Sequence, residues 1–266
     1  MLPFFRKIRW RLASENQLFK YSRYAVGEIV LVVVGILIAL QINNWNEDRI
    51  RKENISTYMK KMIGDLNYDI RFLSIWGNAN RFRYNSSQHL LVLSGQKPTK
   101  QGYSLDATEF VFPNLWNKPI PIDFDADFVN VAFIQTLISG NMNPNSFTID
   151  ELQNNGLFSH IKNDSLKASI FEYYAEYERR LGSVEDSNAK KYRDDWVDSL
   201  TENGYNAEEI SDLKGALNWL KNDQVATARL KNLIFNAQWR YRSADVLIEE
   251  ANKLIEMINR YELKDE

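Results

Sequence analysis

The residue of this sequence with the clearest chemical potential is Glu28, which lies in a run, residues 24–42, that only Glu28 and Gln41 interrupt with polar side chains. A carboxyl group in a membrane-spanning helix is costly to bury unless it pairs, reaches water or transfers protons. At 100° per residue, Gly35 and Ala39 share one narrow sector of the helix with Glu28. Two small residues four positions apart let a second helix approach closely. We therefore expect Glu28, Gly35 and Ala39 to form a helix–helix interface in the membrane.

Two other interpretations of Glu28 stay open. The carboxylate lies one turn inside the apolar run, so it can extend to the headgroups, to Arg23 or to Lys20 at little cost. Alternatively, a single-pass helix with one acidic residue, followed by an extracytoplasmic domain, resembles the layout of proton-coupled stator subunits of the ExbD, TolR and MotB type. Those subunits act beside a multi-pass partner. The chain departs from that pattern, because it carries Glu rather than Asp and no peptidoglycan-binding or TonB-type signature follows.

No other combination of residues predicts catalysis or metal binding. The two histidines, His89 and His160, lie in different contexts, and the short motifs of metalloproteases, serine hydrolases and nucleotide-binding loops do not occur. This excludes a histidine-rich metal centre, and the carboxylates show no ligand spacing. Asp65 and Asp69, and the adjacent pair at 194–195, are interpreted as solvated helix surface. We expect no catalytic residue, no metal, no cofactor and no enzymatic activity.

Aromatic residues suggest two further binding surfaces, each with a simpler alternative. Candidate pocket residues between helices are Tyr173, Tyr174, Tyr177 and Tyr192. An aromatic bundle core is the favoured interpretation of these tyrosines. Trp116, Pro119 and Pro121 form a candidate binding surface on a proline-containing loop. Packing of that loop against the helices is the favoured alternative.

The apolar run predicts a membrane anchor. Nineteen residues at about 1.5 Å each span about 28 Å, close to the hydrocarbon thickness of a bilayer. No small-x-small cleavage site precedes the polar segment that follows, so a retained anchor is predicted rather than a signal peptide. The excess of Lys and Arg before the run predicts a cytoplasmic N-terminus and a periplasmic C-terminal region. The basic residues either bind anionic lipid or only set this orientation. The expected interface anchors are Arg6, Lys7, Arg9, Arg11 and Trp45.

Composition narrows the remaining function classes. The absence of cysteine excludes disulfides, thiolate metal sites and cysteine nucleophiles. A formal net charge of −2 gives no general attraction to nucleic acid. Eleven Gly and six Pro are few for 266 residues, which favours long helices.

We expect an all-α fold, with one N-terminal transmembrane helix that continues into a periplasmic antiparallel helical bundle. The expected divisions are a basic cytoplasmic segment at 1–23, the transmembrane helix at 24–42, a membrane-proximal long helix at 43–94, a proline-containing loop at 95–124 and a helical bundle region at 125–266. Apolar residues from Ile55 to Leu73 recur at spacings of three and four, and a heptad pattern runs from Ala237 to Ile258. The last helix should pair back on the membrane-proximal helix, antiparallel to it. A parallel coiled coil between subunits is the alternative.

Local signals predict where several helices begin. Capping boxes are expected at Ser14 and at Thr148. Ser165 is expected to cap one long helix that runs toward Trp196, and Asn206 is expected to start another.

The N-terminal segments FFRKIR and YAVGEIVLVVVGILIALQINNWNE carry a resemblance to a known family. The signature GEI…VGILIALQINNWNE resembles the start of an uncharacterised membrane-protein family of Bacteroidota that is catalogued as a domain of unknown function. The resemblance covers roughly the first fifty residues. It implies a single-pass inner-membrane protein and supplies no catalytic residues.

Three functions follow as hypotheses. The leading one is a non-enzymatic module in which the span associates, as a homo-oligomer or with another membrane protein, and the periplasmic bundle binds a partner. The second is a proton-coupled stator-like subunit with a multi-pass partner. The third is a periplasmic bundle that senses a ligand, although about twenty cytoplasmic residues are too few for an output domain.

Overall fold

The computed structural model describes residues 18–99, 116–138, 140, 142–206 and 208–265. These residues contain seven α-helices, one 3-10 helix and no β-strand, which confirms the predicted all-α fold. The chain divides into two compact units, Met1–Thr57 and Tyr58–Glu266. The predicted capping box at Ser14 lies outside the described residues.

Helix α2 (Leu18–Leu93) carries the described part of the first unit and the first helix of the second. The predicted transmembrane and membrane-proximal helices are therefore one uninterrupted element. The helix ends where Gly95 adopts a left-handed backbone conformation with φ of 79°. There the N–H groups of Ser94 and Gln96 donate to the carbonyls of Leu90 and Leu91, which satisfies the last turn.

In the first unit, α2 becomes polar beyond the apolar run and is supported by pairs along its own surface. Asn43 donates to Glu47 at 2.7 Å, and Arg49 pairs with Glu53 at 2.7 Å. Arg51 pairs with Asp48 at 2.8 Å. Each such pair at a spacing of three or four stabilises an exposed helix by about 0.2–0.5 kcal/mol. These pairs support the helix locally in a stretch that has no apolar core.

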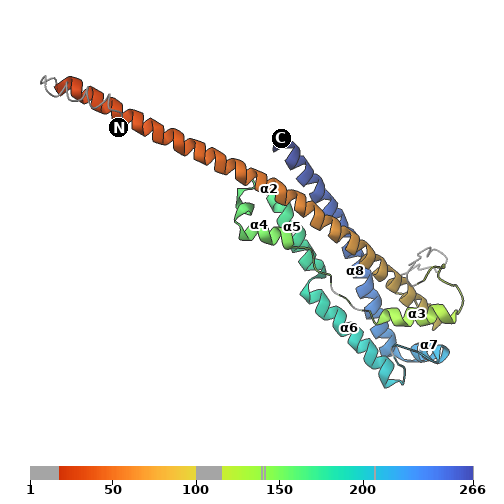
Figure 1. Cartoon of the computed structure of the whole chain (residues 1–266). Helices are drawn as coiled ribbons and strands as arrows, with labels where there is room; N and C mark the ends of the chain where they lie inside the picture. Colours follow the sequence, from red (N-terminus) through yellow and green to blue (C-terminus); the bar gives the residue numbers. More distant parts are fainter. Residues whose placement is uncertain (1–17, 100–115, 139, 141, 207, 266) are drawn as a thin grey trace. The chain divides into compact units, whose positions relative to one another are not determined.

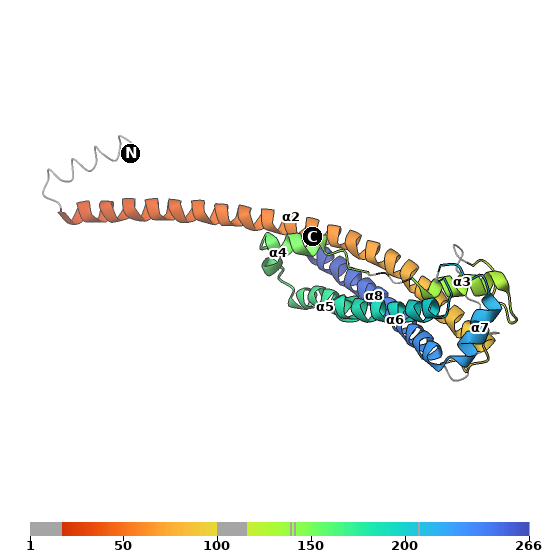
Figure 2. The same ribbon diagram turned by 90° about the horizontal axis from the view of Figure 1, so that it is seen from below.

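The second unit is an antiparallel bundle (Figure 1). Its other helices are α3 (Ala126–Thr136), α4 (Phe147–Asn154), the 3-10 helix η2 (Leu157–His160), α5 (Asp164–Leu181), α6 (Ser183–Glu202), α7 (Leu213–Asn222) and α8 (Gln224–Asp265). Helices α5 and α6 follow one another along α8, and α3 and α7 lie near the other end of the bundle (Figure 1, Figure 2).

Helix α8 pairs back on the second-unit part of α2. Gly77 lies against Ala244, Tyr84 stacks edge-on with Tyr241 at 5.7 Å between ring centroids, and Lys60 approaches Glu262 at 4.0 Å. Residues with higher numbers in α2 thus contact residues with lower numbers in α8, so the two helices are antiparallel. The C-terminal heptads therefore pack on α2 within one chain.

Several predicted helix starts are wrong, and in two of them a different Asn or Asp caps the helix. Helix α5 is capped by Asn163, whose Oδ1 accepts from Leu166 N at 3.0 Å, so Ser165 lies inside the helix. Helix α7 is capped by Asp212 rather than started at Asn206. Asn and Asp are N-caps at least as good as Ser, since their side chains reach the N–H of the third helical residue equally well.

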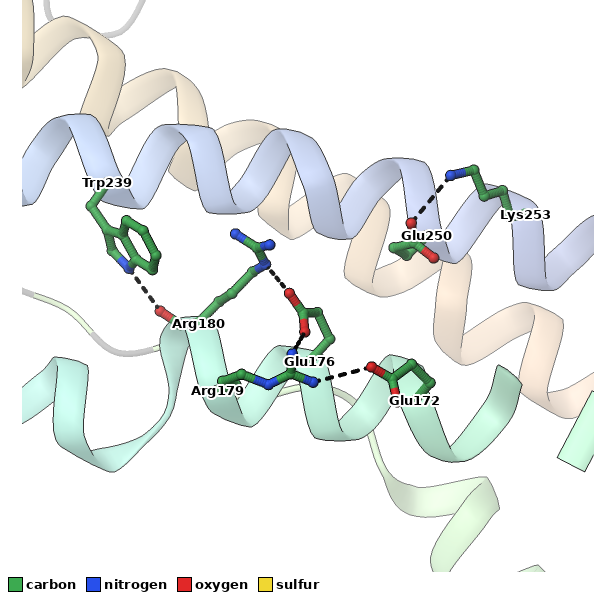
Figure 3. Close-up of polar contacts among 7 residues, drawn as sticks. All are labelled: Glu172, Glu176, Arg179, Arg180, Trp239, Glu250 and Lys253. Carbon is green, nitrogen blue, oxygen red and sulfur yellow. Dashed lines mark hydrogen bonds and ion pairs between the residues drawn. The ribbon is translucent and has the colours of Figure 1, made fainter. Parts of the chain in front are cut away.

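The predicted single helix from Ser165 toward Trp196 is also wrong, because the helix is interrupted at Gly182, between α5 and α6. The C-terminal end of α5 is stabilised by ion pairs within the helix and by a hydrogen bond from α8 (Figure 3). Trp239 of α8 donates its indole N–H to the Arg180 carbonyl at 3.3 Å, and the Arg180 side chain pairs with Glu176. Arginines near a helix C-terminus complement its dipole. The break therefore leaves the α5 end satisfied.

The close approach of α2 to α8 yields a testable expectation. A Cβ at Gly77 would lie 3.0 Å from the Ala244 Cβ, whereas a Cβ at Gly64 would meet nothing within 4 Å. Gly77→Leu should destabilise the second unit by about 1–3 kcal/mol, because the side chain must separate two packed helices. The matched change Gly64→Leu should instead stabilise α2 by up to about 1 kcal/mol. Urea unfolding of the full-length protein in detergent, followed by circular dichroism, measures both, and equal stability of the two variants would contradict the packing.

Candidate functional site

The apolar run of α2 is exposed around its whole circumference. Its large hydrophobic side chains from Tyr24 to Ile42 are between 46% and 72% exposed. By length and composition, this part of the first unit can cross a membrane. A helix that is apolar on every side is stable when lipid or another helix covers it.

The predicted helix–helix residues lie on one face of this helix. Because α2 is continuous, the spacings of seven and eleven residues place Glu28, Gly35 and Ala39 within about 40° of one another. A Cβ at Gly35 would meet nothing within 4 Å, so the face is open at its smallest residue. Trp45 is 67% exposed just beyond the run. The expected anchors Arg6, Lys7, Arg9 and Arg11 lie outside the described residues.

The loop surface predicted around Trp116 is partly turned inward. Trp116 is buried, contacts Phe128 edge-on at 5.0 Å between centroids and donates its indole N–H to the Pro119 carbonyl at 3.1 Å. Pro119 is exposed and Pro121 is half-buried. The indole ring thus packs into the hydrophobic core instead of facing solvent.

Asp65 and Asp69 are not solvated surface, and that interpretation is wrong. Asp69 is 2% exposed, and its carboxylate accepts from Asn145 N at 2.9 Å and Tyr173 Oη at 2.8 Å. Asp65 accepts from Asn145 Nδ2 at 2.9 Å and from Thr148 N at 3.1 Å. We call these two aspartates with Asn145 and Tyr173 the acidic clamp.

The capping box predicted at Thr148 is wrong, because a residue of the acidic clamp accepts the hydrogen bond instead. Helix α4 has Ser146 as its N-cap residue, and the Ser146 side chain caps none of its N–H groups. Asp65 of α2 instead accepts from the second residue of the helix, Thr148. A carboxylate from another helix therefore caps the N-terminus of α4 in place of a local side chain. The same hydrogen bond connects α4 to α2.

Burial dominates the electrostatics of the clamp. Burial raises the pKa of Asp69 above its ordinary value, while the hydrogen bonds from Asn145 and Tyr173 oppose the rise and Asp65 adds to it. Burial and the Asp69 charge also raise the pKa of Tyr173, so the phenol remains a donor. Tyr173 and Tyr177 are buried, as the packing interpretation of the tyrosines predicted.

The last turns of α2 contain an unexpected polar segment. Residues 82–91 are buried on every side, although they include Arg83, Asn85, Ser87, Gln88 and His89. Helices buried all round are normally apolar, since unpaired polar groups lose their hydration. Gln88 is satisfied, because its amide accepts from Thr99 N at 3.0 Å and donates to the Thr99 hydroxyl.

His89 is the buried base of this segment. Both ring nitrogens are buried without a hydrogen-bond partner, and the ring lies edge-on to Phe128 at 5.0 Å between centroids. Burial lowers the pKa of His89 to about 4, so the imidazole is neutral at physiological pH. Within the part of the chain that the structure describes, no group of three or more His, Asp or Glu could hold a metal ion.

A family model described as a family of unknown function (DUF6090) matches residues 28–78. The matched stretch includes Glu28, Gly35, Ala39 and both aspartates of the acidic clamp. The match supports the expectation that the chain contains a domain of unknown function. No curated protein and no solved structure matches the chain.

Sequence reasoning missed the acidic clamp and the polar segment for different reasons. Asp65 and Asp69 have the spacing of any exposed helical pair, and their partners lie 76 and more positions away. The segment around Arg83 did carry a signal. The letters RYNSSQH interrupt the apolar periodicity of α2 for two turns, where a surface helix would keep one apolar face.

The clamp predicts opposite effects for two neighbouring tyrosines. Tyr173→Phe removes a donor from a buried carboxylate and should cost about 1–3 kcal/mol. Tyr177→Phe removes a buried hydroxyl that has no partner and should be neutral or slightly stabilising. Urea unfolding of full-length protein at pH 7 compares the two variants. A Tyr173→Phe protein as stable as Tyr177→Phe would show that the bond to Asp69 contributes nothing.

His89 predicts a loss of stability in mild acid. The His89 imidazole binds a proton near pH 6.5 in the unfolded chain and only near pH 4 in the folded chain. The contribution of the neutral imidazole to the free energy of unfolding is therefore fully present above pH 6.5 and is lost as the pH falls toward 4. The difference between the two pKa values corresponds to about 3 kcal/mol. His89→Leu should flatten this part of the stability–pH curve, whereas the exposed control His160→Leu should not. Superimposable curves for wild type and His89→Leu would contradict the burial of a neutral imidazole.

Proposed function

We propose that this protein is a non-enzymatic membrane-anchored module that assembles through its apolar span and presents its helical bundle to partner proteins. The observation that carries the proposal is the exposed apolar stretch of α2, with Glu28, Gly35 and Ala39 on one face. In lipid, close helix contacts form through small residues and polar groups rather than through apolar bulk. The open surface at Gly35 is suited to such a contact.

The location of the protein is part of the same proposal. The excess of Lys and Arg before the span supports an inner-membrane protein with a cytoplasmic N-terminus and a periplasmic bundle. The resemblance of the N-terminal signature supports a source among the Bacteroidota. The partners would be the lipid bilayer, a second copy of this chain or another membrane or periplasmic protein, and no nucleic acid.

The bundle supports an interaction role rather than catalysis. The acidic clamp directs both carboxylates at donors from its own loop and helices, so neither points to a substrate. Exposed aromatic and aliphatic residues on the bundle offer contact area for a protein partner. Among the large hydrophobic side chains of the second unit, the largest exposed fractions belong to Phe147, Phe171, Phe235, Ile122 and Val225.

The test compares one substitution at two open glycines. Gly35→Leu should lower the oligomeric fraction severalfold, because the side chain holds two helices apart. Gly27→Leu is the matched control, since Gly27 is also open and lies about 80° away from Gly35 around the helix axis. Neither leucine meets an atom of its own chain within 4 Å at Cβ, so an effect would be intermolecular. The readout is intact mass after gentle extraction from native membranes, and equal masses for both variants would remove this face from the proposal.

Glu28→Gln separates the assembly contact from proton coupling in the same preparation. A homo-oligomer that weakens in the variant supports Glu28 as the polar contact of the interface. A stoichiometric multi-pass partner that is retained by an otherwise inactive variant would replace the proposal with the stator-like function.

A further inference from the structure

The guanidinium of Arg83 is buried without a charge to balance it. Arg83 is 5% exposed, and among the described residues its guanidinium makes one hydrogen bond, from Nη1 to Asn80 Oδ1 at 3.2 Å. Its Nε is buried and has no partner. No Asp or Glu of the described residues lies within 4.0 Å of the Arg83 nitrogens. A buried cation without a counter-charge loses its hydration and gains nothing in return.

A second arginine increases the positive charge at this place. Arg240 of α8 is 1% exposed, lies over the Trp76 ring at 5.2 Å and donates Nη1 to the Gly140 carbonyl at 2.8 Å. Burial and the charge of Arg240 lower the pKa of Arg83 to about 9, so Arg83 is still charged at neutral pH.

The free edge of Arg83 has the geometry of an oxyanion receptor. With Nη1 used by Asn80, the donors at Nε and Nη2 remain, and these two point in parallel from one edge of the planar group. Carboxylate and phosphate groups bind this edge through two parallel hydrogen bonds. Ser87, four residues along the same face of α2, has a buried hydroxyl without a partner and supplies a third donor.

We propose that Arg83, with Ser87 beside it and Arg240 nearby, binds a small oxyanion that carries a carboxylate or phosphate group inside the bundle of the second unit. This site goes beyond the proposed assembly function, because it lies in the second unit and does not involve the span. It would make the folding of the bundle responsive to an anion in its surroundings.

The test uses the full-length protein in a maltoside detergent, which contains neither phosphate nor carboxylate. The midpoint of thermal unfolding is measured in chloride, and then with inorganic phosphate or acetate added at constant ionic strength. One of the two anions should raise the midpoint of wild type by at least about 3 °C at saturation. A response to phosphate alone or to acetate alone identifies which oxyanion class the site takes.

Variants at Arg83 make the result specific. Arg83→Met keeps the length of the side chain, and it should abolish the response and leave the midpoint in chloride unchanged or higher. Arg83→Lys keeps the charge but loses the parallel donors, and it should weaken the anion affinity at least about tenfold, a readout that remains if the Met variant fails to fold. Arg81→Met is the control, because Arg81 pairs with Asp245 at the surface and its loss should leave the response intact. The proposal is overturned if neither anion raises the midpoint of wild type, or if Arg83→Met responds as wild type does.

Discussion

The close antiparallel packing of α8 on α2 is the constraint on which the second unit depends. At Gly77 and Ala244 the two helices approach so closely that a methyl group on Gly77 would already be tight. Small residues on the paired faces allow this distance, and larger ones on either side fill the spaces that remain. Helices α5 and α6 then lie along α8, and the buried end of α2 is enclosed. The bundle thus takes its arrangement from one helix pair joined by about 130 residues of intervening chain.

The first unit obeys a different rule, because it has no core of its own in the described residues. Its large apolar side chains from Tyr24 to Ile50 are exposed, and its polar stretch is supported by pairs within the same helix. Water would penalise the apolar surface by about 25 cal/mol for each Å², so the unit requires lipid or a partner. The same α2 therefore meets two environments, and only in the second is its stability set by contacts within the chain.

Periodicity predicted the helices, but it did not predict how polar residues are used. The heptads from Ala237 to Ile258 forecast the α2–α8 pair, because alternate small and large apolar residues mark a packed face. Three helix starts were misplaced, since capping depends on which of several nearby polar residues reaches the N–H groups. Asp69 could not be recognised as buried, because its partners lie 76 and 104 positions away in the chain. The buried polar segment at the end of α2 depends on helices that appear later in the sequence.

Two buried charges on α2 show how a structural polar group differs from one that is available for binding. The carboxylate of Asp69 accepts two hydrogen bonds, and the neighbouring Asp65 accepts two more, so the clamp closes on its own donors. Among the described residues the Arg83 guanidinium makes one hydrogen bond, and the charge of Arg240 acts on it, although it is as deeply buried. A desolvated charge that the fold satisfies contributes to a unique arrangement, whereas one that the fold leaves unbalanced costs stability. Such a cost is offset when an anion binds, and this asymmetry is why Arg83 rather than Asp69 is the place to look for a ligand.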